Sequence, residues 1–110
     1  MAYLGENSIH MWVNMDSTGT PSARDSYGLS SISDNNTGDY TLNFSTATAN
    51  DDYCVLGSNI GATSSYHSTP FAQGIYGLGT GSCRIFTPAM SDLSTMQDTD
   101  AIHVCVITDN

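Results

Sequence analysis

Apolar residues recur at every second position along several short stretches of this chain, and this period constrains the fold more than any other feature. The first such stretch has one apolar side, made by Ile9, Met11, Val13 and Met15. Trp12 stands on the other side. Successive side chains point to opposite faces in a β-strand. We therefore predict a half-buried strand here, with Trp12 facing a second sheet or a neighbouring chain.

A hairpin is predicted in the first half of the chain. Tyr40, Leu42 and Phe44 alternate strictly with polar residues, and a shorter alternation precedes them at residues 27–32. Between the two stretches lie residues 34–39, which are Asp, Asn, Thr and Gly. Asn, Asp and Gly tolerate the positive φ angles of a tight turn. Strand, turn and strand together indicate a β-hairpin.

Further short strands are expected at residues 53–57, 71–76, 83–86 and 101–107. The first of these is apolar on both sides, which predicts a central strand. Residues 89–100 are expected to form a polar linker. In it Met90, Leu93 and Met96 are spaced at three, which would suit a helical turn or a packed loop equally.

Six or seven short strands without a long helix favour an all-β fold. We predict a single-domain antiparallel β-sandwich or jelly-roll-like module over residues 1–110, without an internal repeat. Residues 1–7 would form a short N-terminal arm and residues 58–82 a long loop excursion.

The charge composition excludes several partners. The chain has two arginines, no lysine and eleven acidic residues, for a net charge of −9. So few cations cannot neutralise a run of phosphates, which excludes nucleic acid and anionic membranes. No apolar run approaches the ~20 residues of a membrane-spanning helix, so membrane insertion is not expected. The first residues lack the basic and apolar regions of a signal peptide, and we expect none.

Motifs of enzymes and metal sites are missing from the sequence. There is no Gly-x-Ser-x-Gly, His-Glu-x-x-His or phosphate-binding motif, and the only glutamate is Glu6. We expect no catalytic residue, no cofactor and no metal. Residues 34–39 share the spacing of a calcium-binding loop, but Ser45 stands where that loop needs a carboxylate. Turn formation explains this cluster; a bound cation is the alternative.

The cysteines are spaced too widely for a zinc motif. The chain has three cysteines, Cys54, Cys83 and Cys105. All three fall in predicted strands, where free cysteine behaves as a small apolar residue, and we expect buried free thiols; one disulfide is the alternative. The three histidines are His10, His67 and His103. For His10 and His103 we expect a place in the sheet or at a subunit contact rather than a pH-sensing or metal site.

The two arginines stand among many acids. Arg24 precedes Asp25, and Arg84 lies inside a predicted strand. Each is expected to form a structural ion pair, because excess carboxylates surround so few cations. An arginine that grips an acidic ligand is the alternative, since the same bidentate geometry serves both purposes.

Two stretches resemble a module of tailed-phage virion proteins. WVNMDSTGT at residues 12–20 and RDSYGLSSISDNNTGDYTLNF at residues 24–44 are similar to the C-terminal β domain of tail fibres and tail-fibre-like proteins. The likeness continues more loosely to the last predicted strand. Residues 20–23 depart from the apolar pattern of the module, which weakens the case for a strand before Arg24.

The resemblance implies a non-enzymatic virion protein, a homotrimer assembled in the bacterial cytoplasm, where thiols stay reduced. The leading hypothesis is a tail-fibre or appendage module that contributes to host attachment and contacts other virion proteins. Four residues of the excursion would supply stacking faces to a host glycan or protein, or equally pack a subunit interface: Tyr66, His67, Phe71 and Tyr76. The alternative is a capsid decoration (cement) protein. A more distant one is a secreted carbohydrate-binding domain.

Overall fold

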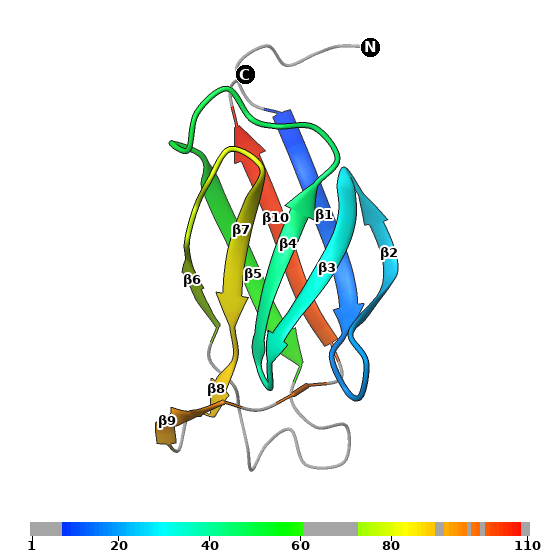
Figure 1. Cartoon of the computed structure of the whole chain (residues 1–110), viewed down its shortest axis with the longest axis vertical. Helices are drawn as coiled ribbons and strands as arrows, with labels where there is room; N and C mark the ends of the chain where they lie inside the picture. Colours follow the sequence, from blue (N-terminus) through cyan, green and yellow to red (C-terminus); the bar gives the residue numbers. More distant parts are fainter. Residues whose placement is uncertain (1–7, 61–72, 90–91, 97, 100, 109–110) are drawn as a thin grey trace.

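The computed structural model describes residues 8–60, 73–89, 92–96, 98–99 and 101–108. Its strands are β1 (Ser8–Asp16), β2 (Ser22–Tyr27), β3 (Leu29–Asn36), β4 (Asp39–Phe44), β5 (Cys54–Ile60), β6 (Gly74–Tyr76), β7 (Ser82–Phe86), β8 (Pro88–Ala89), β9 (Asp92–Met96) and β10 (Ala101–Thr108). Two antiparallel four-stranded sheets pack against each other (Figure 1), and the described residues contain no helix. The predicted all-β sandwich is confirmed.

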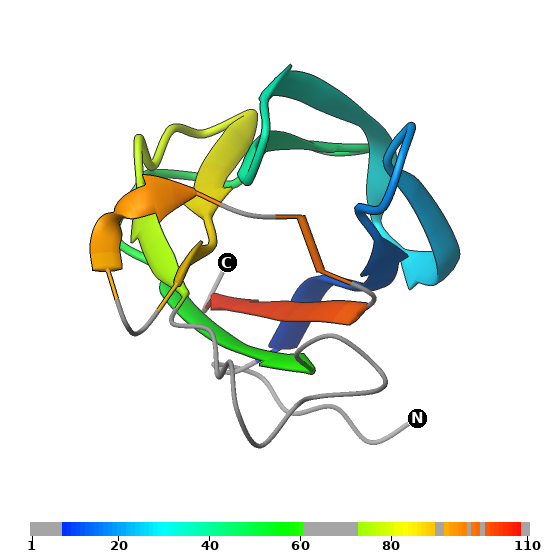
Figure 2. The ribbon, with the colours of Figure 1, turned by 90° about the horizontal axis from the view of Figure 1, so that it is seen from below.

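Each of these two sheets consists of four strands. The first sheet has the order β2-β1-β10-β5, and the second has the order β3-β4-β7-β6. Seen along the long axis of the molecule, they enclose the interior from opposite sides (Figure 2). The short strands β8 and β9 pair with each other at one end of the sandwich, below the main strands in Figure 1.

The core lies between the sheets and takes every second residue of their central strands. Its buried side chains include Met11, Val13, Met15, Tyr40, Leu42, Phe44, Cys83, Ile85, Ile102, Val104 and Val106. In β4 the buried positions alternate with half-buried ones, as predicted. Burial of one large apolar side chain contributes about 1.5–3 kcal/mol relative to exposure. The period-two pattern therefore fixes which face of each strand turns inward.

The chain passes from the first sheet to the second at Gly28, between β2 and β3. Gly28 has a φ of 73°, a conformation that favours glycine. A Cβ atom at this position would lie 2.2 Å from the carbonyl oxygen of His10. The carbonyl oxygen of Gly28 accepts a hydrogen bond of 2.8 Å from the backbone N–H of Ser45. One side of the sandwich is therefore closed by backbone packed directly on backbone.

The opposite side is closed by the side chain of Gln73, which precedes β6 and reaches to β5. Its amide nitrogen donates to Oδ1 of Asn59 at 2.7 Å and to the carbonyl oxygen of Ser58 at 3.3 Å. Gly57 leaves room for this contact, because a Cβ atom there would lie 1.6 Å from Oε1 of Gln73. Since β5 and β6 are edge strands of different sheets, this glutamine bridges two edges that would otherwise be open.

Several strand expectations need correction. The strand predicted at residues 53–57 is not central, because β5 lies at the edge of the first sheet and pairs with β10 alone. Within residues 89–100, expected to form a linker with a helical turn or loop, lie the last residue of the short strand β8 and the whole of β9. A strand before Arg24 does form, because β2 begins at Ser22 and includes Arg24. None of its side chains is buried, so its sequence shows no apolar alternation.

The expected excursion at residues 58–82 contains regular structure where it is described. β5 runs on to Ile60, and β6 occupies Gly74–Tyr76, the end of the stretch predicted as a strand at residues 71–76. Residues 61–72 lie outside the described residues.

Candidate functional site

Part of the outer surface of the first sheet is apolar, although it faces away from the core. Seven residues in two cross-strand rows define what we call the apolar face: Ile9, Trp12, Tyr27, Cys54, Leu56, Cys105 and Ile107. Cys105 lies directly between Trp12 and Leu56 in one of these rows. Tyr27 is 59% exposed and Leu56 is 54% exposed. Large apolar side chains exposed together are typical of interaction surfaces.

A groove of about 400 Å³ crosses this face. Its lining includes Trp12, Leu56, His103 and Cys105, and no Asp, Glu, Arg or Lys. At its polar end the hydroxyl of Ser58 lies 3.3 Å from Nδ1 of His103. In a chain of net charge −9, a surface without carboxylates is one on which a second acidic protein meets little repulsion.

The outer surface of the second sheet has the opposite chemistry. We call its outward side chains on β3, β4, β7 and β6 the polar face: Ser31, Ser33, Asn35, Asp39, Thr41, Asn43, Tyr76, Ser82, Arg84 and Phe86. Nδ2 of Asn43 donates to the hydroxyl oxygens of Ser31 and Ser33, both at 3.0 Å. The hydroxyls of β3 are therefore tied to the neighbouring strand by an amide.

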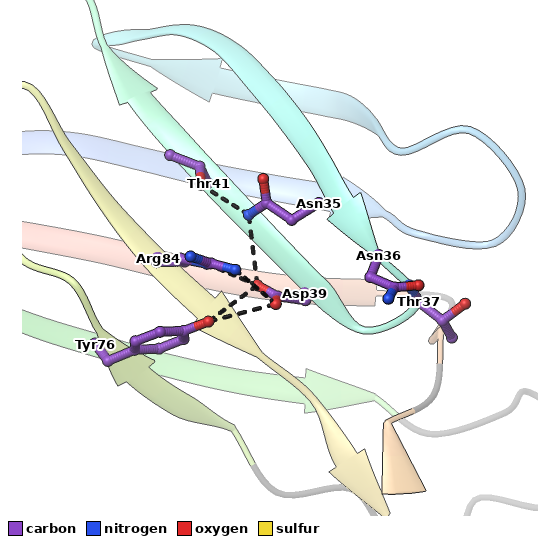
Figure 3. Close-up of polar contacts among 7 residues, drawn as sticks. All are labelled: Asn35, Asn36, Thr37, Asp39, Thr41, Tyr76 and Arg84. Atoms are coloured by element: carbon purple, nitrogen blue, oxygen red, sulfur yellow. Dashed lines mark hydrogen bonds and ion pairs between the residues drawn. The ribbon is translucent and has the colours of Figure 1, made fainter.

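Asp39 is the centre of the charged part of the polar face (Figure 3). Arg84 donates to its two carboxylate oxygens from Nε at 3.0 Å and from Nη2 at 2.9 Å, a bidentate ion pair. The Tyr76 hydroxyl lies 3.3 and 3.4 Å from the same oxygens. Nδ2 of Asn35 donates to Asp39 at 3.4 Å and to the hydroxyl of Thr41 at 2.8 Å. The hydrogen bonds from Arg84 hold the pKa of the Asp39 carboxyl below its usual range.

Aromatic rings support this ion pair from the β6 edge. The guanidinium carbon of Arg84 lies 5.0 Å from the ring centroid of Tyr76, a cation–π contact. The Tyr76 ring in turn meets the Phe86 ring edge-on, with centroids 5.2 Å apart. Gly74 permits this packing, because a Cβ atom there would lie 2.1 Å from the Phe86 ring. The side chains of Tyr76 and Arg84 are thus held in one arrangement.

Arg24, the other arginine, lies on β2 at the edge of the first sheet. Its Nη2 is 3.5 Å from a carboxylate oxygen of Asp16, and its Nη1 is 3.3 Å from Oδ1 of Asn14. Its partner is Asp16 rather than the adjacent Asp25. Hydrogen bonds from Thr18 are the main reason why the pKa of Asp16 is lowered, and the charge of Arg24 adds to them. An exposed pair of this kind contributes little to stability.

The three cysteines are free thiols in different surroundings. Cys83 is buried in the core, and burial raises its pKa to about 12. Burial also raises the pKa of Cys105, which is half-buried on the apolar face. The expectation of a buried thiol is wrong for Cys54, which is exposed because it lies on an edge strand and points away from the core.

The described histidines lie in strands, as expected. Nε2 of His10 is 2.7 Å from the carbonyl oxygen of Thr46, and its ring meets the Phe44 ring edge-on at 5.3 Å. His103 lies on β10 at the end of the apolar face. His67 is outside the described residues. Within the described ranges, no group of three or more His, Cys, Asp or Glu residues is arranged to hold a metal ion.

The predicted contact residues fall into two sets. Three of them lie outside the described residues: Tyr66, His67 and Phe71. Trp12 is on the apolar face and Tyr76 on the polar face, so the structure places these two on opposite outer surfaces. The sequence reasoning missed Leu56 and Asn43. The sequence feature that could have indicated Leu56 is that residues 53–57 are apolar on both sides. Such a strand is either central or an edge strand whose outer side is an interaction surface.

Comparisons with protein-family models, with curated proteins and with solved structures find no match to this chain. Among the described residues, no helix has the length and apolar character needed to cross a membrane. Fold and site together define an all-β sandwich with an apolar area on the outside of one sheet and a surface rich in hydroxyl and amide groups on the outside of the other.

Proposed function

We propose that this chain is a non-enzymatic structural protein of a tailed-phage virion. In this proposal it is a homotrimeric tail-fibre or appendage module that contributes to attachment to the host surface. The observation that carries the proposal is the apolar face, which a copy of the same chain would cover. The resemblance of residues 12–44 to tail-fibre modules supports the proposal that the chain is part of a virion. The proposed number of three copies rests on the same resemblance.

Self-association through the apolar face follows from two properties of its residues. Tyr27 and Leu56 are each more than half exposed in the single chain, and covering such surface contributes about 25 cal/mol per Å². The groove beside Trp12 carries no formal charge, whereas the chain as a whole carries −9. Copies that meet here bury apolar surface in a groove whose own lining holds no carboxylate.

Attachment is assigned to the opposite surface. When the apolar face is covered by other copies, the polar face of each copy turns outward, because the two faces lie on opposite sheets of the sandwich. Its hydroxyl, amide and guanidinium groups are then available to a partner. Assembly in the bacterial cytoplasm agrees with three thiols that form no disulfide.

Sedimentation velocity of the purified chain tests the proposal. We expect a species of three chains at micromolar concentration and a monomer for Leu56→Asp, which places a carboxylate in the apolar face. Leu78→Asp is the matched control, since Leu78 is also exposed (37%) but lies between β6 and β7, away from that face. A wild-type monomer, or equal loss of assembly in both variants, would contradict the proposal. Locating the chain on the capsid of a virion instead of its tail would favour a decoration protein.

A further inference from the structure

We propose that the polar face binds a neutral oligosaccharide. This inference deepens the proposed attachment function and rests on it for its biological setting. The site lies on the outer surface of the second sheet, where β3, β4, β7 and β6 present polar side chains in cross-strand rows. The middle row carries Ser33, Thr41, Arg84 and Tyr76.

The hydrogen bonds within the face fix what it offers to a ligand. An amide nitrogen only donates, so the hydroxyl oxygens of Ser31 and Ser33 accept from Asn43. Each hydroxyl then has its own hydrogen left to donate. Asn43 keeps its amide oxygen as an acceptor. The surface therefore presents one acceptor and two donors whose hydrogen bonds to one another already restrict their orientation before a ligand arrives.

A related arrangement lies beside it with the strands exchanged, because the amide now comes from Asn35 on β3 and its acceptors from β4. Nδ2 of Asn35 uses its hydrogens on Thr41 and on the Asp39 carboxylate, which as an anion can only accept. The amide oxygen of Asn35 points away from both partners in Figure 3 and is left to accept. The hydroxyl of Thr41 accepts from Asn35 and keeps its hydrogen to donate. Two units of donor and acceptor thus lie across the β3–β4 pair.

Arg84 adds donors without adding net charge. Its Nε and Nη2 are bound to Asp39, and this ion pair leaves the Nη1 group for other acceptors. The Tyr76 ring, which is 39% exposed, holds the guanidinium in place through the cation–π contact. The Asp39 carboxylate cancels the charge of Arg84, and the chain carries −9. A polyanionic ligand would therefore be repelled.

A neutral sugar fits this set of groups best. Each hydroxyl of a sugar ring both donates and accepts, so neighbouring hydroxyls can pair with the alternating donors and acceptors of the face. The apolar side of the ring can rest on an aromatic side chain such as Tyr76. A protein partner fits less well, because the centres of protein interfaces are apolar, and here the only large apolar rings are those of Tyr76 and Phe86.

The test begins with binding of the full chain to an array of purified neutral O-antigen polysaccharides, with acidic capsular polysaccharides beside them. We expect binding to one or more neutral polysaccharides. The Asn43→Ala and Thr41→Val variants should each weaken that binding about tenfold. Asn50→Ala is the control, since Asn50 lies in the loop before β5, away from the polar face, and should bind as the wild type does. Circular dichroism would verify that all three variants fold.

The outcomes separate this inference from the proposed function. Binding of neutral polysaccharide that Asn43→Ala weakens and Asn50→Ala does not supports the inference even if the chain sediments as a monomer, in which case only the trimer fails. A trimer that binds no neutral polysaccharide overturns the inference and leaves self-association intact. Preference for acidic polysaccharides, or equal binding by Asn43→Ala and Asn50→Ala, would also overturn it.

Discussion

Replacing Gly28 by alanine should remove a large part of the stability of this protein, whereas the same change at Gly19 should remove little. Both glycines have nearly the same backbone conformation, with φ of 73° at Gly28 and 74° at Gly19. An alanine in this left-handed region costs about 1–2 kcal/mol wherever it stands. The two sites therefore share one penalty and differ only in the space around the new methyl group.

That space is open at Gly19 and closed at Gly28. No atom lies within 4 Å of a Cβ placed at Gly19. At Gly28 the Cβ would lie 2.2 Å from the carbonyl oxygen of His10 and 3.2 Å from Cα of Met11. Both obstacles are backbone of β1, which cannot turn aside as a side chain can. We expect a total loss of about 3–5 kcal/mol for Gly28→Ala, in the range of the most damaging single substitutions.

Urea unfolding followed by circular dichroism measures both losses. All proteins should be compared at one protein concentration, because association would make the apparent stability depend on it. Gly28→Ala should lower the unfolding midpoint far more than Gly19→Ala, with an unchanged slope. If the two variants lost the same free energy of unfolding to within about 1 kcal/mol, Gly28 would not lie in close contact with the backbone of β1, which would refute this explanation.

Three further predictions follow from burial and charge. Leu42→Ala should cost about 2–5 kcal/mol in urea unfolding, because Leu42 is wholly buried. The lowered pKa of Asp39 means that its carboxylate stabilises the fold above the ordinary carboxyl pKa of about 4, and that this stability is lost as pH falls through the lowered value. Thermal melts from neutral to acidic pH should therefore show a smaller acid-induced loss for Asp39→Asn than for the wild type. In the Leu56→Asp variant, whose apolar face stays uncovered, iodoacetamide at pH 8 should label Cys54 while the protein is folded. It should label Cys83, whose pKa is raised to about 12 by burial, only after unfolding; mass spectrometry would detect early labelling of Cys83 as a contradiction.

The period-two pattern predicts the core strands well, because burial of one face requires an apolar residue at every second position. β1, β4 and β10 have this alternation and form where the pattern places them. β2 does not have it, since none of the side chains of this edge strand is buried. The pattern also placed β5 in the centre of a sheet. It could not tell a strand covered on both sides from an edge strand that turns Leu56 outward.

The candidate sites were harder to predict because they depend on register between distant strands. Arg84 and Asp39 are 45 residues apart and meet only because β7 pairs with β4. The sequence indicated an ion pair for Arg84 but not its partner. Asn43 looked like an ordinary polar position in an alternating strand. Its contacts with Ser31 and Ser33 follow from the pairing of β3 with β4, which residue types alone do not reveal.

Fluorescence of the single tryptophan tests the central claim most directly, namely that copies of this chain meet through the apolar face. Trp12 is the only tryptophan in the sequence and lines the groove of that face. Emission and acrylamide quenching would be recorded along a dilution series whose assembly state is known from sedimentation. We expect blue-shifted emission and protection from acrylamide in the assembled protein, both lost as it dissociates. Emission and quenching that stay the same while the protein dissociates would place the subunit contact elsewhere and contradict the account.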